Sequence, residues 1–202
     1  DRTTDGKGPV ADKTLAEIMA LKVLPVNTKT VHKLYDYSKF NVEELKVPTM
    51  EEYFDICNRN GCVAFVELKE DKGLIEAMIN AIEKYGMQDR CVISSGNLAL
   101  LEAYRAAGGK EVIHLIFAKP EQIRRVQELG NASVSFKYSD LSAEVDLEIA
   151  GVKIDSFKQL VDHMHSLGIR ICFRAADTQE DALKMIEYGT DYMPSNVKTT
   201  IE

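Results

Sequence analysis

From residue 62 onward, the sequence alternates between short apolar runs, rich in β-branched and aromatic residues, and longer segments with apolar residues at helical spacing. Six strands are predicted, at residues 62–68, 91–94, 112–117, 132–138, 169–173 and 190–193. The helices predicted between them occupy residues 73–85, 97–107, 120–129, 156–166 and 178–188, and a further short helix is possible at 143–149. Such alternation predicts an α/β fold with a parallel sheet and helical crossovers. An open doubly wound sheet and a closed (β/α)8 barrel both fit, although a closed barrel needs about eight strands.

Residues 1–47 do not follow this alternation. They open with Asp-Gly and Gly-Pro turn pairs and end in an irregular polar segment, residues 27–46. Within them a short helix is predicted from residue 15, because Thr14 and Glu17 have the spacing of a capping box. We predict that residues 1–47 are an excursion from the main fold. Residues 48–202 are predicted to form the (β/α) units of the same single domain.

The first predicted strand ends in a carboxylate and an ammonium group. Residues 63–66 are a continuous apolar run, which predicts a strand buried on both faces. Glu67 and Lys69 are two residues apart, so their side chains point to the same side of the sheet. In barrels of parallel strands, chemistry takes place at the C-terminal strand ends. The pair could therefore hold a divalent cation and a phosphate, or it could be a simple ion pair at a strand end.

Composition excludes several classes of function. The net charge is −7 with 25 lysines and arginines, so no basic surface for nucleic acid is indicated. No apolar run approaches the roughly 20 residues that span a bilayer, and no signal peptide is visible. The compartment, cytoplasmic or exported, stays open, as does the oligomeric state. The cysteines beside strand-like runs, Cys62, Cys91 and Cys172, are predicted to be small buried hydrophobic residues, and a zinc site is not indicated.

Five segments, in order along the chain, together resemble the glycerophosphodiester phosphodiesterase family. The first is D-R-T-T-D-G-K-G-P-V at residues 1–10, followed by T-L-A-E-I at 14–18. The others are V-P-T-M-E-E at 47–52, F-V-E-L-K at 65–69, V-I-S-S at 92–95 and G-T-D-Y-M at 189–193. The resemblance covers nearly the whole chain. It implies a (β/α)8 TIM barrel, of which this chain would carry about six strands, with most of a small insertion at residues 1–47.

The resemblance also implies an activity and a site. The family hydrolyses glycerophosphodiesters, in lipid metabolism, to glycerol 3-phosphate and an alcohol with a divalent metal, Mg²⁺ or Ca²⁺. By this resemblance Glu67 would be one of three carboxylate metal ligands, and Lys69 would face the phosphate. Where the family commonly has Trp-Thr, this chain has Phe173 and Arg174. Phe173 could supply the same aromatic wall, and Arg174 could bind phosphate or pair with Asp177.

The departures from the family pattern concern the catalytic groups. The two histidines that act as general acid and base in the family, and its other metal-binding carboxylates, would precede Asp1, so no catalytic residue is expected within this chain. The chain alone is therefore expected to be inactive, as part of a longer enzyme or as a non-catalytic barrel that binds a phosphorylated ligand or a protein partner. His114 lies in an apolar strand and is predicted to be a hydrogen-bonded core histidine. His163 and His165 are predicted to lie on different faces of one helix.

Overall fold

The computed structural model describes residues 3–24, 41, 44–137, 144–173 and 176–195 of the 202-residue chain. The chain divides between Tyr53 and Phe54 into two compact units, which are described separately. All buried hydrophobic side chains among the described residues lie in the second unit, from Phe54 to Met185.

The first unit contains short helices and few buried groups. Its described elements are a 3₁₀ helix η1 (Val10–Asp12), the helix α1 (Leu15–Met19) and the start of α2 (Met50–Asn60). Thr14 and Glu17 form the predicted capping box, with Thr14 N donating to Glu17 Oε2 over 2.7 Å and Glu17 N donating to Thr14 Oγ1 over 3.3 Å. The predicted start of α1 is therefore confirmed. Thr49 and Glu52 make the same exchange at the start of α2.

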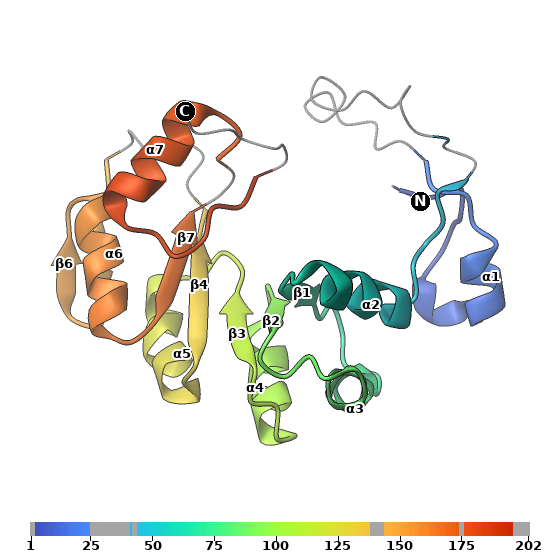
Figure 1. Ribbon diagram of the computed structural model, residues 1–202. Coiled ribbons are helices and arrows are strands. Elements are labelled where there is room, and N and C mark those ends of the chain that lie inside the picture. The colour runs from blue at the N-terminus through green and yellow to red at the C-terminus, as the bar shows by residue number, and fades with distance from the viewer. Residues whose placement is uncertain (1–2, 25–40, 42–43, 138–143, 174–175, 196–202) are drawn as a thin grey trace. The chain divides into compact units, whose positions relative to one another are not determined.

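The second unit is built on a five-stranded parallel sheet (Figure 1). Its strands, in spatial order, are β1 (Ala64–Glu67), β2 (Cys91–Ser95), β3 (Val112–Leu115), β4 (Ala132–Phe136) and β7 (Arg170–Phe173). The helices that connect or follow them are α3 (Leu74–Tyr85), α4 (Leu98–Ala106), α5 (Ile123–Leu129, preceded by the 3₁₀ helix η5, Pro120–Gln122), α6 (Phe157–Ser166) and α7 (Gln179–Tyr188). The alternation of strands and helices is confirmed, and the order of the strands follows the chain as in a (β/α) barrel.

The predicted sixth strand, residues 190–193, is not a strand among the described residues. The segment does run beside β7, where Asp191 N donates to Ile171 O over 2.9 Å and Ala176 N donates to Pro194 O over 2.7 Å. The backbone N–H of Ile171, however, donates to a side-chain oxygen, Asp191 Oδ2, over 2.8 Å, and not to a backbone carbonyl of this segment. The backbone therefore does not continue a regular strand pairing.

The possible helix at residues 143–149 is also wrong for the described part of that range. Strands β5 (Leu147–Ile149) and β6 (Val152–Ile154) form an antiparallel hairpin there. Its two turn residues, Ala150 with φ 54° and Gly151 with φ 83°, are both left-handed, as a tight hairpin turn requires. The apolar residues at 147, 149, 152 and 154 follow the period of a strand, and Ile149 and Ile154 are buried.

The two faces of the parallel sheet differ in character. On one face lie Ala64, Val66 and Leu68, all buried. The other face is called here the open face. It consists of the residues that alternate with these and their partners across the sheet: Phe65, Glu67, Val92, Ser94, Val112, His114, Ser133, Ser135, Arg170 and Cys172. Val63 and Phe65 are 56% and 46% exposed, so the prediction of a strand buried on both faces is wrong. Among the described strands β1 pairs only with β2, which leaves it at the edge of the sheet.

Candidate active site

Glu67 and Lys69 lie at the carboxyl end of β1. Glu67 is the last residue of the strand and lies opposite Ser94, so its side chain belongs to the open face and not to the face with Val66. Lys69 Nζ donates to Glu67 Oε1 over 2.5 Å. The side chains of Lys69 and Glu67 remain 74% and 40% exposed. The structure thus shows the ion pair and leaves both groups accessible to a solute.

The described residues do not form a metal site by themselves. Mg²⁺ and Ca²⁺ require about six or more oxygen ligands. Glu67 offers one carboxylate, and that carboxylate already accepts a hydrogen bond from Lys69. Across the described ranges, no group of three or more His, Cys, Asp or Glu residues is arranged to hold a metal. Glu67 as a metal ligand therefore stays a prediction.

Of the two other predicted substrate contacts, Arg174 and Phe173, only Phe173 lies among the described residues. Arg174 lies outside the described residues. Phe173 is fully buried, and its ring meets the ring of Phe157 edge to face, with centroids 5.1 Å apart. It also borders the cavity described next. A substrate contact by either residue stays a prediction.

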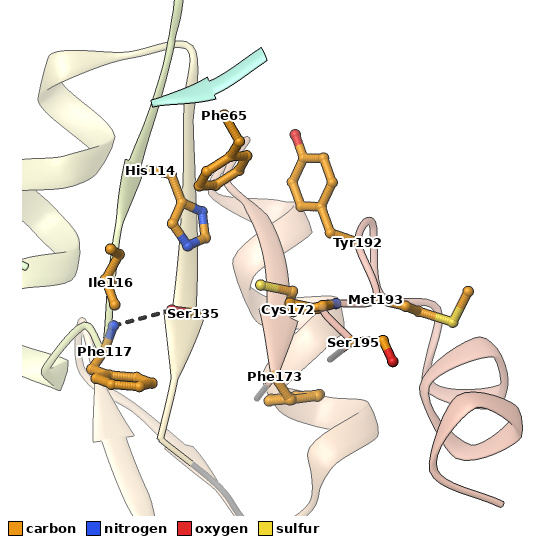
Figure 2. Close-up of a pocket in the computed structure, with 11 residues that line it drawn as sticks. Phe65, His114, Ile116, Phe117, Ser135, Cys172, Phe173, Tyr192, Met193 and Ser195 are labelled. Atoms are coloured by element: carbon orange, nitrogen blue, oxygen red, sulfur yellow. Dashed lines mark hydrogen bonds between the residues drawn. The ribbon is translucent and has the colours of Figure 1, made fainter. Parts of the chain in front are cut away.

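A cavity of about 600 Å³ opens on the carboxyl half of the open face (Figure 2). It is lined mainly by apolar side chains from β1, the loop after β3, β7 and the segment 192–195; the principal ones are Phe65, Ile116, Phe117, Phe173, Tyr192 and Met193. His114, Ser135 and Cys172 also face it. Sequence reasoning missed this group. Alternation along each strand does not show which residues of different strands share a face. That requires the register between the strands, which the sequence does not give.

His114 is a hydrogen-bonded core histidine, as predicted. It is 4% exposed, and its Nδ1 lies 2.8 Å from Ser133 Oγ. Its ring also meets Phe65 edge to face, with centroids 5.2 Å apart. Burial lowers the pKa of His114 from its usual 6.5 to about 4, so the imidazole is neutral at physiological pH.

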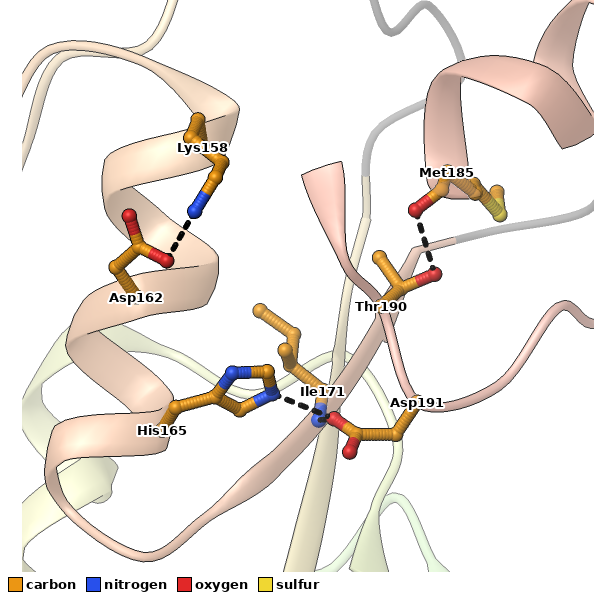
Figure 3. A network of polar contacts seen from close by, with 7 residues as sticks. All are labelled: Lys158, Asp162, His165, Ile171, Met185, Thr190 and Asp191. Carbon is orange, nitrogen blue, oxygen red and sulfur yellow. Dashed lines mark hydrogen bonds and ion pairs between the residues drawn. The ribbon is translucent and has the colours of Figure 1, made fainter. Parts of the chain in front are cut away.

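The two histidines of α6 contact different elements, which confirms that they face different sides of the helix. His163 Nε2 lies 3.0 Å from Ile149 O of the hairpin. His165 Nε2 lies 2.9 Å from Asp191 Oδ2, the oxygen that also accepts from Ile171 N (Figure 3). Asp191 therefore attaches the segment after α7 to both α6 and β7.

The cysteine predictions are confirmed at two of three positions. Cys91 and Cys172 are buried, and burial raises the pKa of each thiol to about 12. Cys62 is exposed, so its prediction is wrong. It lies two residues before the start of β1, outside the sheet.

The fold and the site define the class of protein: parallel (β/α) units of the TIM-barrel type, with a carboxylate and an ammonium at a carboxyl strand end. Residues 1–196 match the sequence model of the glycerophosphoryl diester phosphodiesterase family. The chain therefore belongs to this family of phosphodiester hydrolases.

Individual relatives agree with this assignment. The chain is 28% identical over 195 residues to a glycerophosphodiester phosphodiesterase of Caldanaerobacter subterraneus subsp. tengcongensis, covering 95% of this chain and 70% of that protein. A phosphodiesterase from Oleispira antarctica, solved in complex with the product sn-glycerol-3-phosphate, has a TM-score of 0.72 at 21% identity, covering 96% of this chain and 71% of that one. A glycerophosphodiester phosphodiesterase from Agrobacterium tumefaciens has a TM-score of 0.70 at 15% identity, covering 98% and 74%. At such identities the structural likeness establishes the fold.

None of the helices in the described part of the chain combines the length and the apolar character needed to cross a membrane.

Proposed function

We propose that this chain serves the hydrolysis of glycerophosphodiesters to glycerol 3-phosphate and an alcohol, a phosphoric diester hydrolysis of lipid metabolism. The observation that carries the proposal is the position of Glu67 and Lys69 in a chain of this family. Both side chains lie at the carboxyl end of β1, Glu67 on the open face and Lys69 just beyond the strand, and both remain accessible. The carboxyl ends of parallel strands are where sites of barrel enzymes form.

In this proposal Lys69 binds the phosphate. Its ammonium is 74% exposed on a flexible stem, so it can turn from Glu67 to a phosphate oxygen. A positive charge held there would offset negative charge on the phosphoryl oxygens as the ester bond breaks. Arg174 and Phe173 are proposed as further substrate contacts, and residues 1–47 as the insertion of the barrel.

Glu67 is proposed as one ligand of a divalent cation, Mg²⁺ or Ca²⁺. Because the described residues offer no complete ligand set, further carboxylates would have to come from outside them. A bound cation would supply positive charge beside the phosphate. Direct calcium titration with Glu67→Gln as the comparison tests this role without an activity measurement.

Binding of glycerol 3-phosphate tests the phosphate role of Lys69. We expect Lys69→Met to weaken binding about tenfold, because a charge-assisted hydrogen bond is lost. Lys72→Met is the matched control, since Lys72 belongs to the same loop, pairs with Glu70 over 2.9 Å and is 67% exposed. Isothermal titration of the three proteins provides the measurement. Equal weakening in both variants, or no binding to the parent chain, would contradict the proposal.

The 202-residue chain by itself is proposed to be inactive. The described histidines do not offer a general acid or base at the carboxyl end of β1: His114 is held by Ser133, and His163 and His165 contact Ile149 and Asp191. We expect this chain to hydrolyse glycerophosphocholine no faster than buffer, measured by release of glycerol 3-phosphate. Turnover at an enzymatic rate would refute the expectation.

A non-catalytic barrel that binds a phosphorylated ligand, or a protein partner, is the second candidate. It is favoured by the Glu67–Lys69 ion pair, which already neutralises the proposed metal ligand. The two candidates differ in metal dependence. Glycerol 3-phosphate binding that is the same in EDTA and in Mg²⁺ favours the binding function, and binding that needs Mg²⁺ favours the enzyme.

A further inference from the structure

A serine of the neighbouring strand holds the chain where β1 ends. Ser95, the last residue of β2, donates from its hydroxyl to the backbone oxygen of Leu68 over 2.8 Å. Leu68 lies between Glu67 and Lys69. We propose that Ser95 is a positioning residue of the candidate site, which fixes the point from which the side chain of Lys69 extends. The inference rests on the proposed function in one respect, the binding of phosphate by Lys69.

Ser95 is itself fixed by burial and by hydrogen bonds to other elements. It is 1% exposed. Its hydroxyl accepts from Asn97 N, at the start of α4, over 3.1 Å, while it donates to Leu68 O. A serine hydroxyl has one hydrogen and two lone pairs, so both bonds form together. Its backbone oxygen accepts from Ile116 N, just beyond β3, over 2.9 Å. Ser95 therefore connects the end of β1 to β3 and α4.

Leu68 is held at its side chain and at both of its backbone groups. Its side chain is buried, with 2% exposed. Its N–H donates to Ser94 O over 2.7 Å, and its carbonyl accepts from the hydroxyl of Ser95. This second contact is buried, and a buried carbonyl that loses its donor is unfavourable. The hydroxyl therefore stabilises one orientation of the Leu68 carbonyl.

The orientation of this carbonyl also orients the backbone of Lys69. The carbonyl of Leu68 and the N–H of Lys69 belong to one planar peptide unit. The side chain of Lys69 is 74% exposed, so packing does not direct its ammonium group, and its reach depends on where its stem begins. A flexible side chain on a fixed backbone loses less freedom on binding than one on a mobile backbone. Ser95 can thus favour phosphate binding without touching the phosphate.

Ser94, one residue earlier, makes a similar hydrogen bond with a different consequence. Its hydroxyl donates to Val66 O over 3.1 Å. Val66 lies inside the paired part of β1, where the register with β2 also holds the chain. Leu68 lies beyond the last residue of β1, so support from a side chain matters more there. Ser95 is therefore the serine assigned to Lys69.

Nuclear magnetic resonance of the ligand-free 202-residue chain tests the positioning directly. In the unaltered chain the order parameter of the Lys69 amide should be about 0.85, the value of a rigid backbone. In Ser95→Ala it should fall toward about 0.6, whereas that of Val66, inside the paired strand, should stay. A low value for Lys69 in the unaltered chain, or an unchanged value in Ser95→Ala, would overturn the inference.

Binding of glycerol 3-phosphate tests whether Ser95 acts through Lys69. Isothermal titration should show about threefold weaker binding for Ser95→Ala, because more freedom is then lost on binding. Adding Ser95→Ala to Lys69→Met should weaken binding no further. Equal weakening in both backgrounds would show that Ser95 supports the fold and not Lys69, and would overturn the inference. If Lys69→Met alone leaves binding unchanged, the proposed function fails, whereas the order parameter still decides whether Ser95 holds Lys69.

A second hydroxyl provides the control for both measurements. Thr190 Oγ1 donates to Met185 O over 3.2 Å at the end of α7. Thr190→Val removes a hydroxyl-to-carbonyl bond of the same kind and should change neither the Lys69 order parameter nor the affinity. If Ser95→Ala does not fold, Ser95→Cys replaces it, since a thiol of similar size is only a weak donor. A change as large in Thr190→Val as at Ser95 would contradict the specific role of Ser95.

Discussion

Arg105 on α4 connects two loops through one guanidinium group. Its Nε donates to Leu129 O over 3.1 Å, Nη1 to Gly109 O over 2.9 Å, and Nη2 to Gly130 O over 2.9 Å. A planar group with five fixed donors can serve several carbonyl oxygens at once. The side chain is partly buried. This burial lowers the pKa of Arg105, because it removes water from the charged guanidinium group.

Replacing Arg105 by Met should destabilise the protein by about 2–4 kcal/mol, because several loop carbonyls lose a charged donor while the apolar stem is kept. Urea unfolding provides the measurement. Arg124→Met is the matched control, since Arg124 is exposed and donates to one carbonyl, Ala150 O, over 3.1 Å. The control should cost less than about 1 kcal/mol. Equal losses would show that Arg105 does not hold the loops.

His114 should make stability depend on pH. Its pKa is lowered by burial in the folded protein, to about 4 from 6.5, so the unfolded chain takes up a proton first as the pH falls. The effect is absent above pH 6.5, grows as the pH falls from 6.5 toward 4, and is constant below. Between pH 7.5 and 5 the free energy of unfolding should fall by about 2 kcal/mol more in the unaltered protein than in His114→Leu. Parallel pH curves for the two proteins would contradict this.

Single residues were predictable from the sequence where their partners are near in the chain. Thr14 and Glu17 are three apart, and their spacing alone indicates the capping box that the structure shows. His114 could be recognised as a core histidine from the apolar run around it. Its partner Ser133 and its neighbour Phe65 lie on other strands, so neither contact has a local signal.

At the scale of elements, the hairpin β5–β6 has an unfavourable residue in its turn. Ala150 has φ 54°, a conformation that costs a residue with a Cβ about 1 kcal/mol. Asn is the residue most often found there, before Gly. Ala150→Asn should therefore raise the free energy of unfolding by about 0.5–1 kcal/mol, measured by urea titration.

A β-branched residue at the same position provides the opposite test. Ala150→Val should destabilise the hairpin by more than about 1 kcal/mol, because Val tolerates positive φ poorly. Neither change removes the hydrogen bond from Arg124, which goes to the backbone carbonyl of Ala150. If Asn and Val had the same effect, backbone conformation would not be the cause.

The same turn explains why the hairpin could not be predicted. An Asn-Gly pair would have indicated a two-residue turn, and Ala-Gly does not. The helices α3 and α7, in contrast, have helical spacing in the sequence and a left-handed glycine at their ends, Gly86 and Gly189, and both were predicted closely. Segment 190–193 failed as a strand because Asp191 replaces a backbone partner with its side chain, which composition cannot indicate.

At the scale of the whole molecule, buried hydrophobic side chains are concentrated in one of the two units. Residues 3–24 contain no buried hydrophobic side chain, whereas the side chains of β2, β3 and β4 are almost fully buried. Local opening of a segment costs little where few apolar groups are buried. The amides of residues 3–24 should therefore exchange at least about a hundredfold faster than those of β2–β4, measured by hydrogen exchange with mass spectrometry. Comparable protection in both would contradict this distribution of stability.

Fold class and family were the most predictable properties of the whole chain, because both depend on patterns that extend over its length. Alternating strands and helices predicted the parallel sheet, and five ordered segments predicted the family that residues 1–196 match. The candidate site was predictable only at Glu67 and Lys69, which are two residues apart in the chain at the end of β1. The cavity of the open face is formed by side chains from segments far apart in the chain, and it required the three-dimensional structure.

The polar side chains across the centre of the sheet also have a consequence for folding. Ser94 lies opposite His114, and His114 lies opposite Ser133, all three buried among apolar residues. A slip of β4 by one residue would turn Ser133 to the opposite face and leave His114 Nδ1 buried without its partner, a penalty of about 1–3 kcal/mol. Valines and isoleucines would tolerate several alignments of such strands. The serine–histidine–serine row therefore selects one alignment against misaligned sheets, before any ligand is bound.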